Sequence, residues 1–182
     1  ARICRRNLLQ AAGLTLVTPG LVRPASAQPV EAGVSASDFG SAVPITRVRS
    51  ARPLLALTFD DGPHATLTPQ LLDLLAERNV RATFYVVGNR ISHHQVIMGR
   101  IADEGHEIGN HSWSHPSLGG LSDAAILSQI DRTSAAIVEA VGSPPVTMRP
   151  PYGNLSPRQT RMLYASRGLQ SVLWSVDTED WR

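Results

Sequence analysis

Short apolar runs alternate with amphipathic segments along most of the chain. Continuous apolar runs, as in residues 54–59, are typical of strands that are buried on both faces. Apolar residues that recur at helical spacing, such as Ile126, Ile130 and Ile137, indicate helices with one buried face. The pattern predicts strands at 54–59, 82–87, 107–109, 146–148 and 171–176, with helices between them at 68–79, 94–104, 122–141 and 156–168.

This alternation of strands and helices extends over about 130 residues and predicts an α/β fold. Successive strands that are joined by helices form a parallel sheet, either open or closed into a barrel. The chain has 182 residues, of which 42% are hydrophobic, so it is long enough for one domain with its own core. Its single cysteine, Cys4, excludes a disulfide framework and a cysteine-based metal site in the folded part.

The first 27 residues have the features of a secretory signal. Arg5 and Arg6 precede a mildly apolar run, and Ala25-Ser26-Ala27 forms a cleavage signal of small residues. The paired arginines indicate the twin-arginine type of signal. About ten apolar residues cannot span a bilayer of about 30 Å. We therefore expect export to the periplasm or the extracellular space, without stable membrane insertion once the signal is removed.

The segment 28–52 is rich in Ala, Ser, Pro and Val, and we interpret it as a linker before a domain at 53–182. The net charge of the whole chain is +2, with 17 basic and 15 acidic residues. Removing the signal lowers the basic count from 17 to 13 and leaves a net charge of about −2. The chain has no basic stripe of the kind that nucleic-acid binding needs.

Reactive side chains come directly after the predicted strands. In a parallel α/β fold the carboxyl ends of the strands share one edge, and active sites are built there. The side chains concerned follow the first, third, fourth and fifth strands, and they are Asp60 and Asp61, His111 and His115, Arg149 and Tyr152, and Asp177 and Asp180. We expect them to converge on one pocket.

His111 and His115 lie four residues apart, so on a helical turn both imidazoles would face the same side. Two histidines and the carboxylate of Asp61 make a three-ligand set that leaves a position for water. A metal bound there lowers the pKa of that water and polarises a carbonyl group. The histidine pair alone would favour a polar surface loop, and Asp61 on a neighbouring strand end favours the metal site.

Asp60 and Asp61 are adjacent carboxylates at the end of a predicted buried strand. They repel each other and lose hydration there unless each has a partner. A cation beside one and Arg149 beside the other would supply both partners. Adjacent strand residues point to opposite sides, which predicts two distinct roles. The alternative interpretation is a simple turn, since Gly62 and Pro63 follow.

Four short motifs in this order resemble the polysaccharide deacetylases, which form carbohydrate esterase family 4 and share the NodB homology domain. The motifs are Thr58-Phe59-Asp60-Asp61-Gly62-Pro63, His111-Ser112-x-x-His115, Arg149-Pro150-Pro151-Tyr152-Gly153 and Asp177-x-x-Asp180-Trp181. The resemblance covers residues 54–181 and implies a distorted (β/α) barrel. It also implies a hydrolase that removes N-acetyl groups from an amino-sugar polymer.

The resemblance implies a role for each of these residues. Asp61, His111 and His115 match the ligands of one divalent metal ion, usually Zn²⁺. Asp60 matches the general base, and Arg149 matches the residue that orients it. The backbone N–H of Tyr152 matches an oxyanion donor. Asp180 matches the residue that tunes a catalytic-acid histidine, and Ser112 is expected to hold the histidine loop.

One feature of the family is missing from this sequence. The fifth motif, a Leu-x-His segment that carries the catalytic acid, does not occur before Arg182. Five predicted strands are also too few for a barrel of seven or eight, so we expect a C-terminally truncated domain. The remaining histidines are interpreted as structural or solvent-exposed, and they are His64, His93, His94 and His106.

Three functions are compatible with these observations. The first is removal of N-acetyl groups from chitin oligomers, peptidoglycan or exopolysaccharide, which makes an N-acetylated glycan the expected partner. The second is hydrolysis of O-acetyl esters or cyclic imides on the same fold. The third is a non-catalytic, metal-loaded module that binds glycans. Asp60 argues against the third, because a binding module has no use for a base beside a metal ligand.

Overall fold

The computed structural model describes residues 42–51 and 53–181. All the described residues belong to one compact unit. The predicted signal peptide at 1–27 lies outside the described residues. Within the described part of the chain, no helix combines the length and apolar character needed to cross a bilayer.

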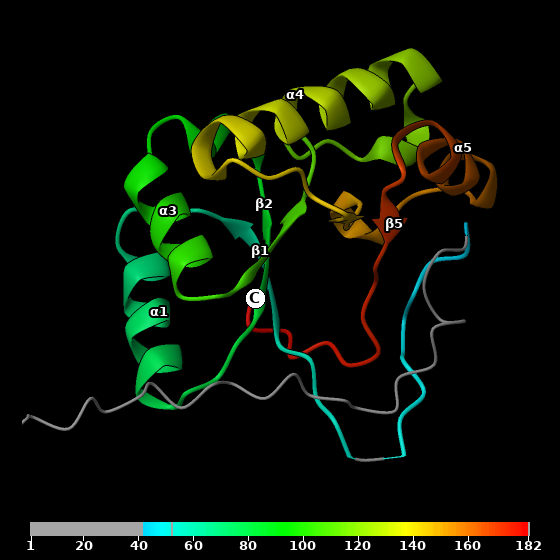
Figure 1. Ribbon diagram of the computed structural model, residues 1–182. Helices are drawn as coiled ribbons and strands as arrows, with labels where there is room; N and C mark the ends of the chain where they lie inside the picture. The colour runs from blue at the N-terminus through cyan, green and yellow to red at the C-terminus, as the bar shows by residue number, and fades with distance from the viewer. Residues whose placement is uncertain (1–41, 52, 182) are drawn as a thin grey trace, which may run out of the picture. The chain divides into compact units, whose positions relative to one another are not determined.

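Five parallel strands form one sheet, in the order β1-β2-β3-β4-β5 (Figure 1). Their bounds are Thr58–Gly62 for β1, Thr83–Val86 for β2, Glu107–Asn110 for β3, Thr147–Met148 for β4 and Gln170–Ser171 for β5. This order confirms the predicted α/β fold with a parallel sheet. Among the described strands, β1 and β5 are the two edges, so these five strands do not close a barrel.

Helices connect the strands as predicted, with one helix that the pattern did not reveal. Their bounds are Leu67–Glu77 for α1, Gly88–Ile91 for α2, Gln95–Asp103 for α3, Asp123–Val141 for α4 and Pro157–Arg167 for α5. Two short 3₁₀ helices, η2 at Leu118–Gly120 and η3 at Pro151–Gly153, lie in the loops. In Figure 1, α1 lies next to α3, and α3 next to α4. Four residues of α2 are too few for helical periodicity to appear.

The core consists of two clusters of buried apolar side chains. The larger cluster joins β2 to the helices that cover it, and its fully buried members include Leu72, Val86, Met98 and Ile101. The smaller cluster lies between α4, α5 and β4, and it includes Leu118, Ile126, Ile130, Met148 and Leu163. Burial of these side chains fixes α4 against the sheet beside β3.

The first strand differs from the prediction of residues 54–59. Its ladder with β2 starts at Thr58 opposite Thr83 and ends at Gly62 opposite Val86. Leu54 and Leu55 lie before it and are 44% and 80% exposed. An apolar run is therefore a poor guide to the start of this strand, because pairing with β2 decides it. Asp60 and Asp61 consequently lie inside the strand rather than after it.

The last strand is also shorter than the predicted 171–176, since β5 ends at Ser171. Part of the predicted linker at 28–52 joins the sheet beside it. Ile45 forms a parallel bridge with Val172, and its N–H donates to the Ser171 carbonyl at 2.9 Å. The folded domain thus includes residues before Pro53.

The helix α1 begins at Leu67, one residue before the predicted start at residue 68, and its N-cap is Thr66. The Nδ1 atom of His64 accepts hydrogen bonds from the N–H groups of Thr66 and Leu67, both at 3.2 Å. Thr68 Oγ1 instead accepts a bond from the His64 N–H. His64 thus binds two of the free N–H groups at the start of this helix.

Candidate active site

A local irregularity of β1 brings two carboxylates to one place. Asp61 has a φ of 67°, and the register with β2 shifts between Phe59 and Gly62. Asp60 Oδ2 therefore lies 3.8 Å and Asp61 Oδ1 3.4 Å from Nε2 of His111. The expectation that the two side chains point to opposite sides is wrong, because it assumed a regular strand.

His111 and His115 are brought together by a loop rather than by a helical turn. Ser112 and His115 have φ values of 66° and 58°, far from the φ of about −60° in an α-helix. The two imidazole rings meet edge to face, with their centroids 4.9 Å apart. The predicted proximity is thus present, but a left-handed backbone produces it instead of the i,i+4 spacing of a helix.

Asp61, His111 and His115 form a compact group of potential metal ligands. One ligand atom from each lies within 4.8 Å of the others, and Asp61 Oδ1 is 3.1 Å from Nε2 of His115. The Nδ1 atom of His111 donates a hydrogen bond to the Arg149 carbonyl at 2.7 Å, which in the neutral ring leaves the lone pair on Nε2. Two imidazole nitrogens and one carboxylate oxygen are a donor set that suits zinc.

The protonation tendencies of this group also suit a cation. The pKa of the Asp61 carboxyl is lowered, chiefly by its hydrogen bond with His111. Burial lowers the pKa of His115, although Asp61 opposes this effect. A carboxylate and a neutral imidazole are the forms that bind a metal ion.

Asp60 is paired with the buried guanidinium of Arg149. The distance from Arg149 Nη1 to Asp60 Oδ1 is 2.7 Å. The same guanidinium donates to Thr58 Oγ1 and to the carbonyls of Val172 and Leu173 at 2.9–3.1 Å. Burial raises the pKa of Asp60, and the charge of Arg149 opposes this rise. Arg149 thus connects β1 to the segment that follows β5.

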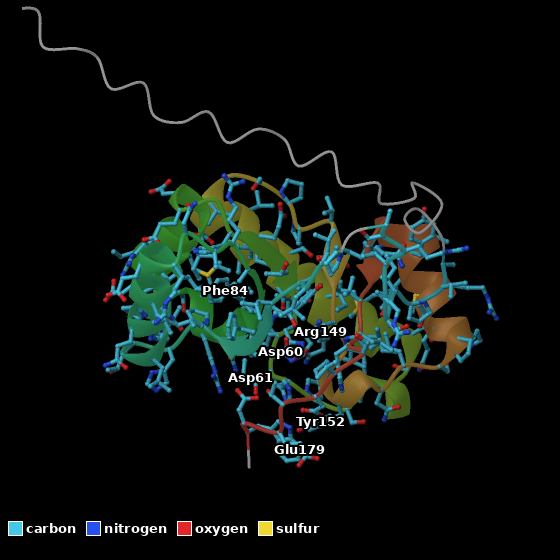
Figure 2. The ribbon with its side chains drawn as sticks, turned by 90° about the horizontal axis from the view of Figure 1, so that it is seen from below. Asp60, Asp61, Phe84, Arg149, Tyr152 and Glu179 are labelled. Atoms are coloured by element: carbon cyan, nitrogen blue, oxygen red, sulfur yellow. The ribbon has the colours of Figure 1, made fainter. Side chains whose placement is uncertain are left out.

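All the residues predicted for the site border one cavity of about 550 Å³. They are Asp60, Asp61, His111, His115, Arg149, Tyr152 and Asp180. Figure 2 shows Asp60, Asp61, Arg149 and Tyr152 gathered near the C-terminal segment that carries Glu179. The expected convergence of separate strand ends on one pocket is therefore present in the structure.

Tyr152 and Asp180 lie at the exposed rim of this cavity. Tyr152 in η3 has a φ of 60°, and its ring packs edge to face against His115 with a centroid distance of 4.9 Å. The Asp180 carboxylate accepts a hydrogen bond from the Thr178 hydroxyl. Of the six described non-glycine residues with positive φ, five lie in or beside the site: Asp61, Ser112, His115, Tyr152 and Glu179. Such strain is typical of functional sites.

Several contributors to the site were missed by the sequence analysis. Arg90 of α2 donates a hydrogen bond to the Asp61 carbonyl, which helps to fix its left-handed backbone. The Tyr85 ring lies under the Arg149 guanidinium, 4.3 Å from Cζ to the ring centroid, and Trp174 borders the cavity. In the sequence, the signal for Tyr85 was a tyrosine within a strand that was predicted to be buried.

A profile of the family described as polysaccharide deacetylase matches residues 47–172. The chain belongs to the polysaccharide deacetylase family. It is 43% identical over 128 residues to the peptidoglycan-N-acetylglucosamine deacetylase PgdA of Listeria monocytogenes, which covers 70% of this chain and 27% of that protein. It is 39% identical over 143 residues to a chitooligosaccharide deacetylase of Rhizobium leguminosarum bv. trifolii, which covers 78% of this chain and 65% of that protein.

The family fold is also evident among solved structures. The structure of the peptidoglycan deacetylase PdaC from Bacillus subtilis superposes with a TM-score of 0.65 at 43% sequence identity. That match covers 69% of this chain and 60% of PdaC. The chain therefore spans less than two thirds of the length of each of these three relatives.

Proposed function

We propose that this protein is a metal-dependent hydrolase that removes N-acetyl groups from an amino-sugar polymer or oligomer. The observation that carries the proposal is the cluster of Asp61, His111 and His115 beside the Asp60–Arg149 pair on one cavity. Relatives named as deacetylases of peptidoglycan and chitooligosaccharide support it. They favour an N-acetylated glycan as the substrate class.

In this proposal Asp61, His111 and His115 hold one divalent cation, for which zinc fits the donor set. When bound, the cation polarises the acetamide carbonyl and lowers the pKa of the attacking water. Asp60 accepts a proton from that water, as a general base. Arg149 favours the ionised form of this carboxylate and holds it in place. Its guanidinium is buried and donates to the carbonyls of Val172 and Leu173, which leaves it little freedom to move.

Tyr152 and Asp180 have the remaining two roles in this proposal. The backbone N–H of Tyr152 donates to the carbonyl oxygen as it becomes negative. Asp180 borders the cavity, and its carboxylate is suited to orient a proton donor for the departing amine. Among the described histidines, His64 accepts hydrogen bonds from N–H groups at the start of α1, and His106 accepts one from the Ala82 N–H at 3.1 Å. These bonds support structural roles for both.

The test is acetate release from three substrates by the metal-loaded protein. We expect release from N-acetylglucosamine oligomers or from peptidoglycan, and much less from O-acetylated xylan. His115→Ala should abolish release and lower the zinc content of the purified protein. Release from xylan alone would indicate an esterase instead. Tight glycan binding without acetate release would indicate the non-catalytic module.

Export is a separate part of the proposal, supported by the twin-arginine pattern and the Ala25-Ser26-Ala27 cleavage signal. Intact-mass measurement of exported protein should show Gln28, or its cyclised form, as the first residue. Replacing Arg5 and Arg6 with lysine should block export. Export that continues unchanged would indicate an ordinary secretory signal.

A further inference from the structure

The backbone N–H groups of the loop between the two site histidines are bound by side-chain oxygens. The four backbone N–H groups of residues 112–115 all donate to side chains. Asn110 Oδ1 accepts the first at 2.9 Å, and Ser112 Oγ accepts the last at 3.1 Å. Gln129 Oε1 accepts both of the middle ones, each at 2.9 Å. These acceptors replace the helical hydrogen bonds that a left-handed loop does not make.

A second set of contacts holds the loop from the opposite side. The carbonyls of Ser112 and Trp113 accept hydrogen bonds from the N–H groups of Gly88 and Asn89, both at 3.0 Å. A Cβ atom on Gly88 would lie only 2.6 Å from the Trp113 ring, so the loop and α2 are in close contact. The loop is therefore bound both by the backbone of α2 and by the Gln129 side chain of α4.

Gln129 is firmly placed, although it does not border the cavity. Its neighbours Ile126 and Ile130 are fully buried in the smaller core cluster. Its own carbonyl accepts a hydrogen bond from Thr133 Oγ1, and its Nε2 atom lies 3.2 Å from Ser114 Oγ. Gln129 thus holds the histidine loop in a fixed position relative to α4, which is itself packed in the core.

The two histidines depend on this loop to different degrees. His111 follows β3 directly, and its ring is oriented by the Arg149 carbonyl. His115 lies at the far end of the loop, where its ring packs against the rings of His111 and Tyr152. Its main-chain position follows from the hydrogen bonds of the loop.

We propose that Gln129 is a positioning residue for the metal site, which sets metal affinity by holding His115 opposite Asp61 and His111. This inference rests on the proposed metal-dependent function. Groups that orient metal ligands typically contribute about 10- to 100-fold in metal affinity. The carboxamide oxygen is the decisive atom, because it accepts both N–H groups.

The experiment measures Zn²⁺ affinity of the metal-free chain by competition with a chromophoric chelator. Gln129→Met keeps the length and helix propensity of the side chain but has no oxygen acceptor. Gln129→Glu keeps oxygen acceptors. Gln70→Met makes the same exchange at an exposed position of α1 and serves as the control. Circular dichroism and the melting temperature of each metal-free variant report folding, and Gln129→Ala replaces the Met variant if that variant does not fold.

We expect Gln129→Met to weaken Zn²⁺ binding about 10-fold or more. Gln129→Glu and the Gln70 control should remain within a few-fold of the wild type. The absorption spectrum of bound Co²⁺ should also change in the Met variant, because the ligand geometry changes. A purely structural role would lower the melting temperature and leave both metal readouts unchanged.

Two results would overturn the inference while leaving the proposed function intact. One is wild-type Zn²⁺ affinity in Gln129→Met, and the other is a loss in Gln129→Glu as large as that in the Met variant. A wild-type chain that binds no Zn²⁺ would instead overturn the proposed function, and this inference with it.

Discussion

Asp60 and Asp61 are neighbours in sequence with opposite electrostatic environments. Burial raises the pKa of Asp60, although Arg149 lies 2.7 Å away. The side chain of Asp61 is more exposed, at 57% against 31%, and hydrogen bonding with His111 lowers its pKa. Two carboxylates whose environments separate their proton affinities are suited to different tasks. The one with the higher affinity for protons is the better base, and the other is the better metal ligand.

The first prediction follows from this division between the two carboxylates. Asp60→Asn should keep the metal and lose about 10²- to 10⁴-fold of the deacetylation rate, because an amide cannot take a proton from water. Metal analysis and acetate release on the same preparation measure both quantities.

Asp61→Asn is the matched control, since asparagine also tolerates the left-handed backbone at that position. It should lose metal together with activity. Near-normal turnover in Asp60→Asn would assign the base to another residue.

At the scale of elements, local signals predicted the helices well. Ser122 is the N-cap of α4, and Gly142, in the left-handed conformation, is the C-cap of that helix. In α5 the N-cap is Ser156 and the C-cap is the left-handed Gly168. These signals are contained within a few residues of the chain, so they can be recognised without knowledge of the tertiary structure.

The sequence-based predictions were wrong where pairing with distant segments decides the structure. The start of β1 depends on β2, and Ile45 joins the sheet only because Val172 lies beside it. The histidine pair was recognised as a metal site, but its loop conformation depends on Asn110 and Gln129, which lie outside the motif. Residue identity thus predicted the chemistry of the site, and long-range contacts determined its geometry.

The second prediction concerns the N-terminus of α5. Ser156 Oγ accepts a hydrogen bond from the Gln159 N–H, while the Gln159 side chain accepts one from the Ser156 N–H. Ser156→Ala should lower the free energy of unfolding by about 1 kcal/mol, because it removes this capping box. Urea denaturation measures the change. Ser128→Ala, at an exposed position in the middle of α4, should cause no loss, because alanine has the higher helix propensity. Equal losses in both variants would contradict the capping explanation.

The third prediction concerns the contact of β2 and β3 beneath Arg149. A Cβ atom on Gly109 would lie 2.4 Å from the ring of Tyr85, and the same ring lies under the guanidinium. Gly109→Ala should therefore displace the ring and Arg149 with it. A displacement of about 1 Å at a catalytic group can cost about 10²-fold in rate.

Acetate release should consequently fall in Gly109→Ala while the zinc content remains. Tyr85→Phe keeps the ring and should retain most of the activity, which separates ring position from the hydroxyl group. Gly99 offers the matched control, because a Cβ atom there meets nothing within 4 Å. Full activity in Gly109→Ala would show that the ring can move without disturbing Asp60.

At the scale of the whole molecule, the site joins segments that lie far apart in the chain. Asp61 belongs to β1, whereas His111 and His115 follow β3, and β2 lies between these two strands in the sheet. Arg149 adds hydrogen bonds to Thr58 and to the carbonyl of Val172. A cation bound by all three ligands would therefore connect two strands that do not pair with each other.

This geometry leads to the fourth prediction, that metal binding stabilises the folded chain. A ligand that binds only the native state at about 100 times its Kd adds about 2.7 kcal/mol of stability. For a domain of this size that corresponds to a rise in Tm of about 5–10 °C. Scanning calorimetry with saturating Zn²⁺, and again after addition of a chelator, measures the shift.

His115→Ala should abolish the shift, because it removes one ligand and leaves the sheet intact. His106→Ala is the informative control: His106 is buried and accepts the Ala82 N–H, so its loss should lower the baseline Tm and leave the metal-dependent shift in place. A shift of equal size in His115→Ala would place the stabilising metal elsewhere in the chain.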